Sequence, residues 1–330
     1  MDTTAPPVTT RVVAGTGVIA LDRPGALNAL DLTMVRLMTD ALMRWRDDDG
    51  VRSVLVVSTS PKAFCAGGDI RAMRDAGMRG DDAAVTAYFS SEYALNALIA
   101  DYPKPYTALV DGFAMGGGMG ISVHGSALVV TERATLAMPE TAIGFFPDIG
   151  ASHFLPRLPG AVGWYLGLTG ARISAEAAVE CGLATHYVPA ADLPSLQAAL
   201  TGADDPEAVL KRFAAVAPPS ELTAHREAIA RCFGAPDLAA VGARLAAERE
   251  DREWARGTLE VLRRASPMSL RITFEVLRAG AVDGLEGCLA RELELSRATA
   301  REPDFHEGVR ALLVDKDRNP SWSPGEPSVI

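Results

Sequence analysis

Residues 104–125 read KPYTALVDGFAMGGGMGISVHG. The aromatic and β-branched run Tyr106–Val110 predicts a buried strand, a glycine cluster follows it, and a helix is expected from about Gly117 to Gly125. Glycine lets the backbone approach a ligand closely, and the N–H groups at a helix start can stabilise negative charge. The stretch therefore predicts a strand–glycine–helix unit of an α/β protein. The alternative is a tight turn whose glycines serve only packing.

A second glycine segment occupies the same position after another predicted strand. The run Val51–Ser58 predicts a buried strand, and residues 63–70 then read AFCAGGDI. Two backbone N–H groups, one from each glycine segment, would form an oxyanion hole for a reacting carbonyl group. Two tight βα turns remain the alternative, but the occurrence of both segments favours function.

The third informative segment places two acids in an apolar loop. Residues 137–150 read AMPETAIGFFPDIG, so Glu140 and Asp148 are separated by apolar residues, proline and glycine. Carboxylates in apolar surroundings are costly unless they are paired or used, which makes both acids candidates for acid–base or nucleophilic roles. For either acid alone, capping or bonding of the loop is the alternative.

Strands and helices alternate in the first part of the chain, which predicts α/β architecture with mostly parallel strands. Gly15-Thr16-Gly17 lies between two β-branched runs and predicts a hairpin, and Asp31 opens a helix that reaches about Trp45. Beyond about residue 205 the strand signal ends. Helices are expected at residues 239–250, 253–264, 267–279 and 285–299. The predicted domains are therefore residues 1–205 and a helical region, residues 206–330.

Composition excludes several classes of protein. The 330 residues carry 32 Lys and Arg against 42 Asp and Glu, a net charge of −10 that argues against a general nucleic-acid binder. No apolar run is long enough to cross a membrane, and the first residues lack the pattern of a signal peptide. The four cysteines lie far apart, which predicts free thiols in a reducing compartment. We expect a cytoplasmic protein with no nucleic-acid or membrane partner.

The motifs of several enzyme classes are absent from the sequence. It contains no GxxxxGK[ST], GxGxxG, HExxH or GxSxG, and its five histidines are scattered singly. These absences remove the usual signs of a nucleotide loop, a zinc site and a serine triad, so no metal is expected. If the protein is an enzyme, carboxylates and backbone amides must carry the chemistry.

Five segments together resemble the crotonase (enoyl-CoA hydratase/isomerase) superfamily, and the likeness covers most of residues 10–322. They are FCAGGDIRAM (64–73), KPYTALVDGFAMGGGMGISVHG (104–125), MPETAIGFFPDIGASHFLPRLPG (138–160), LTGARISAEAAVECGLATHYV (168–188) and DFHEGVRALLVDKDRNPSW (304–322). The resemblance implies a crotonase-like spiral of ββα turns over residues 1–205 and a helical C-terminal region. It also implies an acyl-CoA thioester as substrate, with CoA as part of the substrate and no separate cofactor, and a possible homo-oligomer.

The resemblance also implies site residues. The oxyanion hole would be the N–H groups of Ala66 and Gly117, and Glu140 would be the carboxylate that hydratases and hydrolases of the superfamily share. Asp148 matches the second acid that is characteristic of the hydrolases. The implied substrate contacts are Glu92, Gly68 and Asp69.

One departure from the superfamily pattern narrows the expected reaction. The second glutamate of hydratases falls at Gly120, which has no side chain, so hydrolysis or isomerisation is favoured over hydration. The leading interpretation, which the resemblance implies, is hydrolysis of a short branched 3-hydroxyacyl-CoA in valine catabolism, with Glu140 as base or nucleophile. The alternatives are an enoyl-CoA isomerase or hydratase-like enzyme, and a non-catalytic acyl-CoA-binding member. Candidates for the CoA phosphates are Arg23, Lys62, Arg71 and Lys104.

Overall fold

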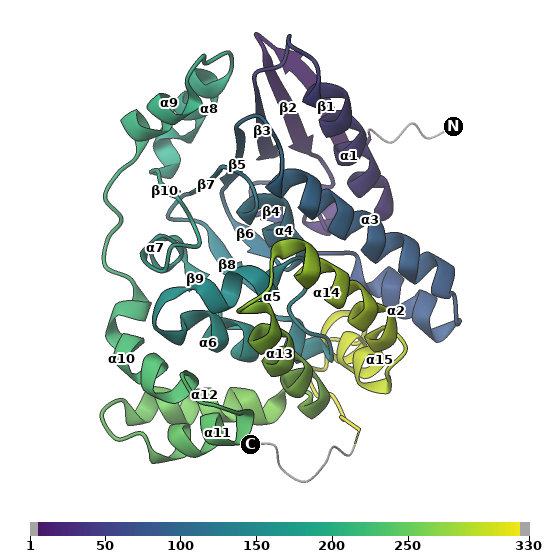
Figure 1. The fold of residues 1–330 in the computed structure, drawn as a ribbon, viewed down its shortest axis with the longest axis vertical. Helices are drawn as coiled ribbons and strands as arrows, with labels where there is room; N and C mark the ends of the chain where they lie inside the picture. Colours follow the sequence, from purple (N-terminus) through teal and green to yellow (C-terminus); the bar gives the residue numbers. More distant parts are fainter. Residues whose placement is uncertain (1–5, 324–330) are drawn as a thin grey trace. The chain divides into compact units, whose positions relative to one another are not determined.

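The computed structural model describes residues 6–323 of the chain and is shown in Figure 1. These residues form two compact units, and each unit is assembled from three separate stretches of sequence. The first unit contains residues 6–68, 94–136 and 173–220. The second contains residues 69–93, 137–172 and 221–323. Helix α3 (Asp82–Ala100) carries residues of both.

The larger sheet lies in the first unit, and its strands are coloured from purple to teal in Figure 1. Strands β1 and β2 pair as an antiparallel hairpin, and the remaining neighbours are parallel. The middle strands are buried along nearly their whole length, as expected for β-branched runs covered on both faces. In spatial order they are β1 (Val8–Val13), β2 (Thr16–Leu21), β3 (Ser53–Ser58), β5 (Tyr106–Val110), β7 (Ala127–Val130) and β10 (His186–Tyr187).

A smaller sheet contains four strands of two or three residues each. It was not predicted, because so short a strand cannot display the two-residue alternation that identifies strands in a sequence. Strands β4 and β6 of this sheet are parallel neighbours. In spatial order the strands are β4 (Ala63–Cys65), β6 (Phe113–Met115), β8 (Thr135–Ala137) and β9 (Ile173–Ser174).

Helices of the first unit cover the larger sheet. The Asp31 side chain caps the first of them by accepting the Met34 N–H at 2.8 Å, as the sequence predicts. Leu196, Leu200 and Leu210 pack on sheet residues that include Leu55 and Val129. The helices are α1 (Leu32–Arg46), α4 (Gly117–Val123), α7 (Ala175–Glu180), α8 (Leu193–Leu200) and α9 (Pro206–Phe213).

The second unit is built mainly of helices, with α13 in contact with α5, α6 and α14. Ser266 caps α13, and Leu270, Phe274 and Leu277 on its predicted apolar face are buried. The helices are α2 (Ile70–Met78), α5 (Ala151–Phe154), α6 (Val162–Thr169), α10 (Glu221–Phe233), α11 (Leu238–Ala247), α12 (Arg252–Arg264), α13 (Pro267–Gly280), α14 (Leu285–Thr299) and α15 (Pro303–Val309).

The predicted division of the chain at residue 205 differs from the two units of the structure. Residues 69–93 and 137–172 belong with the C-terminal helices, and residues 206–220 belong with the sheet. The reason is tertiary packing: α5 and α6 place their buried residues against α13, and α2 packs on α15. Such partners are distant in sequence, so no composition shift marks the boundary.

One expectation from composition is met within the described residues. All four cysteines are free and buried. No helix among residues 6–323 combines the length and the apolar character needed to cross a membrane.

Candidate active site

The two glycine segments lie side by side in the first unit. Both follow parallel neighbours, β4 and β6, whose carboxyl ends meet at one edge of the smaller sheet. Gly67 has φ +105°, and a Cβ atom built on it would lie 3.2 Å from the Met115 carbonyl oxygen and 3.9 Å from the Gly117 nitrogen. A Cβ atom on Gly118 would lie 2.3 Å from the Cys65 carbonyl oxygen. Glycine is therefore required here for the close approach of two backbones.

The amides of these segments are not all available to a ligand. The Ala66 N–H donates to the Leu27 carbonyl oxygen at 3.0 Å, which contradicts its prediction as an oxyanion-hole donor, because this proton is already used by the fold. The neighbouring bridge between Leu30 and Gly68 uses the Gly67 carbonyl oxygen, which accepts the Leu30 N–H at 2.8 Å. Gly117 is the first residue of α4, so its N–H has no acceptor within the helix.

Four carboxyl groups of the second unit form what we call the buried acid cluster. They are Glu92, Glu140, Asp148 and Glu292, whose residues are 2%, 6%, 6% and 0% exposed. Asp148 is their common neighbour, because its negative charge raises the pKa of each of the other three, although burial is the largest cause in every case. The structure therefore brings three predicted acids together and adds a fourth.

Glu140 opens a short 3-10 turn, Glu140–Ile143, directly after the β8 strand and Pro139. Its Oε2 atom is buried and has no hydrogen-bond partner among the described residues. Burial raises the pKa of Glu140 well above its usual value, and the charges of Asp148 and Glu92 raise it further. A carboxylate with a raised pKa and an unpartnered oxygen can accept a proton or attack a carbon atom near neutral pH.

Asp148 is held by a hydrogen-bonded chain of side chains. The Tyr93 hydroxyl donates to Asp148 Oδ2 at 2.6 Å, and the hydroxyl oxygens of Tyr93 and Ser296 lie 2.5 Å apart. Because the phenol has one proton and gives it to Asp148, the Ser296 hydroxyl must donate to the Tyr93 oxygen. Burial raises the pKa of Asp148 to about 7, although the Tyr93 hydrogen bond opposes that rise. Asp148 therefore exchanges its proton in the physiological range.

Glu92 presents a second unpartnered oxygen. Its Oε1 atom is buried without a hydrogen-bond partner among residues 6–323. Burial raises the pKa of Glu92 well above its usual value, the Asp148 charge adds to the rise, and a hydrogen bond from Tyr88 opposes it. Because buried polar atoms are nearly always hydrogen-bonded, two unpartnered carboxyl oxygens in one cluster point to a polar ligand.

Glu292 was missed by the sequence analysis. It lies on α14, and its carboxylate accepts the Gly150 N–H at 2.7 Å, the Ser152 N–H at 3.0 Å and the Ser152 hydroxyl at 2.5 Å. Burial raises the pKa of Glu292 to about 8 against the opposing effect of these hydrogen bonds. Helical spacing could have found it, because Glu292 falls on the same face as the buried Cys288, Ser296 and Thr299.

Aromatic side chains supply the apolar surroundings of the acid loop. Phe145, between Glu140 and Asp148, stacks on Phe89 with ring centroids 5.6 Å apart and on Phe146 at 4.8 Å. The ring centroid of Phe305 lies 5.3 Å from that of Phe145. The Glu140 and Asp148 carboxyl groups are buried beside these rings and lose solvation, which raises their pKa values.

Other predicted residues have structural partners. The Asp69 carboxylate caps α2 by accepting the Ala72 N–H at 3.5 Å, and its role as a substrate contact stays a prediction. Lys104 Nζ donates to the carbonyl oxygens of Trp45 and Asp48 at 2.5 and 2.7 Å, and Arg71 donates to a backbone carbonyl oxygen. These two cations are thus used by the fold. Across the described part of the chain, no group of three or more His, Cys, Asp or Glu is placed to hold a metal.

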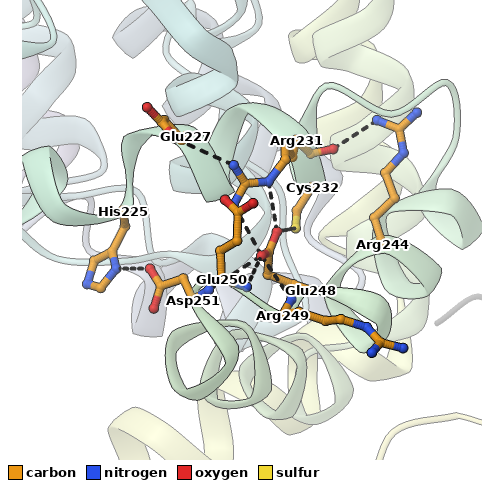
Figure 2. Close-up of polar contacts among 9 residues, drawn as sticks. All are labelled: His225, Glu227, Arg231, Cys232, Arg244, Glu248, Arg249, Glu250 and Asp251. Atoms are coloured by element: carbon orange, nitrogen blue, oxygen red, sulfur yellow. Dashed lines mark hydrogen bonds and ion pairs between the residues drawn. The ribbon is translucent and has the colours of Figure 1, made fainter.

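A second set of acids, the Glu248 network (Figure 2), contains a carboxyl group whose pKa is lowered rather than raised. Glu248 accepts Arg231 Nε at 3.0 Å and the N–H groups of Arg249 and Glu250 at 3.0 and 2.8 Å. The Arg231 hydrogen bond lowers the pKa of Glu248 to about 2, with the backbone N–H groups contributing. This network closes the turn between α11 and α12 and holds the Glu248 carboxyl group in its charged form near neutral pH.

The chain belongs to the enoyl-CoA hydratase/isomerase family, whose model matches residues 16–329. Its fold is the crotonase fold, as the sequence predicts. A crystal structure described as an enoyl-CoA hydratase from Rhodobacter sphaeroides superposes with a TM-score of 0.91 at 40% identity, covering 98% of this chain and 94% of that one.

Two relatives carry a more specific name. The mitochondrial 3-hydroxyisobutyryl-CoA hydrolase of Xenopus tropicalis is 44% identical over 93% of this chain and 82% of its own length. The enzyme of the same name from Danio rerio is 41% identical over 94% of this chain and 84% of its own length. Both names place these relatives in mitochondria, and the cytoplasmic location expected for this chain stays a prediction.

Proposed function

We propose that this protein is an acyl-CoA thioester hydrolase that converts 3-hydroxyisobutyryl-CoA and water to 3-hydroxyisobutyrate and CoA. The observation that carries the proposal is the buried acid cluster, in which Glu140 has an unpartnered oxygen and Asp148 a pKa of about 7. Relatives named for this reaction are similar over more than nine tenths of the chain.

The carbonyl oxygen of the thioester would accept hydrogen bonds from backbone amides of the two glycine segments. We propose Gly117 as one donor, because it is the first residue of α4 and its N–H has no acceptor within the helix. We propose Gly68 as the other, in place of Ala66, because the Ala66 proton is bonded to Leu27 and the Leu30 bridge uses the carbonyl of Gly67. Fixed amides aimed at the developing oxyanion typically contribute 10²–10³-fold to kcat.

Glu140 would act on the thioester carbon in one of two ways. As a nucleophile, its carboxylate forms a C–O bond while the C–S bond breaks, which gives a mixed anhydride and a CoA thiolate that takes up a proton. Water then cleaves the anhydride and restores the carboxylate. As a general base, Glu140 instead takes a proton from a water molecule whose oxygen attacks the same carbon. Both routes need Glu140 in its ionised form.

Asp148 and Glu92 would bind the substrate's 3-hydroxyl group. The Glu92 Oε1 atom is a buried acceptor without a partner, and the Asp148 carboxyl is oriented by Tyr93. A site built to hydrogen-bond a substrate hydroxyl discriminates strongly against the analogue that lacks it, because its polar groups are then left unpaired. This role accounts for acids beyond the single one that the chemical step needs.

Hydration of an enoyl-CoA is the competing function, because the structurally similar Rhodobacter protein is described as a hydratase. Water addition across a double bond needs a group to deliver a proton as well as a base. The position that the superfamily pattern gives to the second glutamate is Gly120, a buried residue of α4 with no side chain. We therefore favour hydrolysis.

The test is release of free CoA by the purified full-length protein. A thiol reagent would follow CoA release from 3-hydroxyisobutyryl-CoA, isobutyryl-CoA and acetyl-CoA, and mass spectrometry would identify the acid. Loss of enoyl absorbance with crotonyl-CoA would measure hydration in parallel. We expect the fastest CoA release from the 3-hydroxy ester. Rapid crotonyl-CoA hydration without thiol release would overturn the proposal in favour of a hydratase.

A further inference from the structure

The segment that follows Asp148 has a backbone conformation that needs support. Ile149 has φ +58° and Gly150 has φ +82°, so two consecutive residues are in the left-handed region, where a β-branched residue is a rare outlier. The next element, α5, has only four residues, and its N-cap, Gly150, has no side chain to bond the first amides of the helix. Another part of the unit must satisfy these donors.

Glu292 of α14 supplies that support. Its two carboxyl oxygens accept three donors from Gly150 and Ser152, at distances between 2.5 and 3.0 Å. The residue is 0% exposed, and its partners among the described residues are neutral. Burying a carboxyl group at such a place is costly unless several hydrogen bonds compensate, so the group is not an incidental surface acid.

The same face of α14 also holds the Asp148 side chain. Ser296 lies one helical turn after Glu292 and bonds the Tyr93 hydroxyl, which in turn donates to Asp148 Oδ2. One helix face therefore fixes Asp148 by two routes, through the backbone that follows it and through its carboxyl group.

We propose that Glu292 is a positioning residue for Asp148. The hydrogen-bonded Ser296–Tyr93 pair is the second set of contacts that positions the Asp148 carboxyl group. This inference rests on the role proposed above for Asp148 in binding the substrate's hydroxyl. Glu292 contacts no reacting atom in this account. It sets the angle at which the Asp148 carboxyl meets the hydroxyl, and it thereby sets selectivity for hydroxylated substrates.

The measurement is the hydroxyl selectivity, defined as kcat/KM for 3-hydroxyisobutyryl-CoA divided by kcat/KM for isobutyryl-CoA. Glu292→Gln keeps the size of the side chain but replaces one acceptor oxygen with a donor that opposes an N–H or hydroxyl group. We expect the selectivity to fall about tenfold in Glu292→Gln and about threefold in Tyr93→Phe and in Ser296→Ala. Equal losses on both substrates would reduce Glu292 to a merely structural residue.

A double-mutant cycle tests whether Glu292 acts through Asp148. In an Asp148→Asn background, Glu292→Gln should produce no further change in selectivity, whereas independent effects would multiply. The matched control is Glu248→Gln, which also removes a carboxylate that accepts backbone N–H groups in the same unit but has no contact with this segment. We expect its selectivity to equal that of the wild type.

Amide hydrogen exchange tests the positioning role of Glu292 without measuring enzyme activity, so its result does not depend on the proposed function. Hydrogen exchange of the Gly150 and Ser152 amides should be about tenfold faster in Glu292→Gln and unchanged in Glu248→Gln. Unchanged exchange in Glu292→Gln would overturn the positioning role whatever the protein catalyses. Conversely, if Asp148→Asn keeps the wild-type selectivity, the proposed role of Asp148 fails even where the exchange result stands. If Glu292→Gln does not fold, Ser296→Ala and Tyr93→Phe test the contacts of the Ser296–Tyr93 pair through the same hydroxyl selectivity.

Discussion

Two regions of the second unit hold carboxyl groups in opposite states. In the buried acid cluster the pKa of Asp148 is about 7 and that of Glu292 about 8, because burial removes solvent and no cation of residues 6–323 pairs with them. In the Glu248 network (Figure 2) the pKa of Glu248 is about 2, because an Arg231 guanidinium and backbone N–H groups bond its charged form. The same chemical group is thus a proton-exchanging acid in one place and a permanent anion in the other.

The difference lies in what surrounds the oxygens. The Glu248 carboxylate is bonded by a cation that two further acids, Glu227 and Glu250, also contact. Glu140 and Glu92 each have a buried oxygen without a partner among residues 6–323, next to aromatic rings and to Asp148. A fully satisfied carboxylate serves the fold, whereas an unsatisfied one is available to a substrate.

The largest expected effect is that of Glu140→Gln. The substitution removes the base or nucleophile but keeps the shape of the side chain, so CoA release should fall 10²–10⁴-fold while the circular dichroism spectrum stays unchanged. Glu248→Gln should retain the wild-type rate. A Glu140→Gln variant with more than about a tenth of the wild-type kcat would contradict a primary catalytic role, since acid–base groups contribute more than that.

The second effect concerns Asp148. Asp148→Asn should lower kcat/KM for 3-hydroxyisobutyryl-CoA by well over tenfold, at least about 1.4 kcal/mol, and for isobutyryl-CoA by less, because only the first substrate has a hydroxyl to lose its partner. Steady-state kinetics on both esters measures the difference. Equal losses would make Asp148 a general catalytic or structural acid, and no loss would return it to a residue that bonds its own loop.

The third effect is on pH dependence. Glu140 must be ionised to act, and its pKa is raised by burial and by the Asp148 charge, so kcat/KM should rise with pH through an acid limb well above the ordinary glutamate value of about 4.5. Asp148→Asn removes a negative neighbour, lowers the pKa of Glu140 and should move this limb to lower pH. A pH profile of CoA release for both proteins tests the shift, and a wild-type limb near 4.5 would contradict the raised pKa.

The smallest effect is on stability and has opposite signs in the two regions. Burial raises the pKa of Glu140 above its unfolded value, so the native state holds its proton longer and loses stability as pH rises from about 4.5 through the raised pKa. Glu140→Gln should therefore raise Tm by about 2–4 °C at pH 8 and leave it unchanged at pH 4.

Glu248 provides the opposite sign, because its pKa is lowered to about 2 by Arg231. Its stabilising effect is complete above the unfolded value and is lost as pH falls toward 2, so Glu248→Gln should lower Tm at pH 7 and less so at pH 3. Thermal unfolding of both variants across this range provides the test. The same sign for both substitutions would remove the distinction between the two regions.

Local signals predicted many of the elements. The Asp31 cap predicts α1, Ser266-Pro267 predicts α13, and the β-branched run at Tyr106–Val110 matches β5. They could not predict the smaller sheet, whose strands pair residues that are far apart in the chain, such as Cys65 with Ala114. The Ala66 amide was assigned to a ligand for the same reason, because its acceptor, Leu27, lies 39 residues earlier and its sequence carries no sign of that bond.

The amino-acid sequence by itself determined the family, the glycine segments and the acids Glu92, Glu140 and Asp148, because these depend on residue type and order. Only the tertiary structure decided the state of those acids. Whether a carboxyl group keeps its proton depends on which groups surround it in space, and the sequence does not state that Arg231 reaches Glu248 or that no cation reaches Asp148 among the described residues. The role of Glu292 was also decided by the tertiary structure, since only packing of α14 on α5 brings this residue to the segment after Asp148.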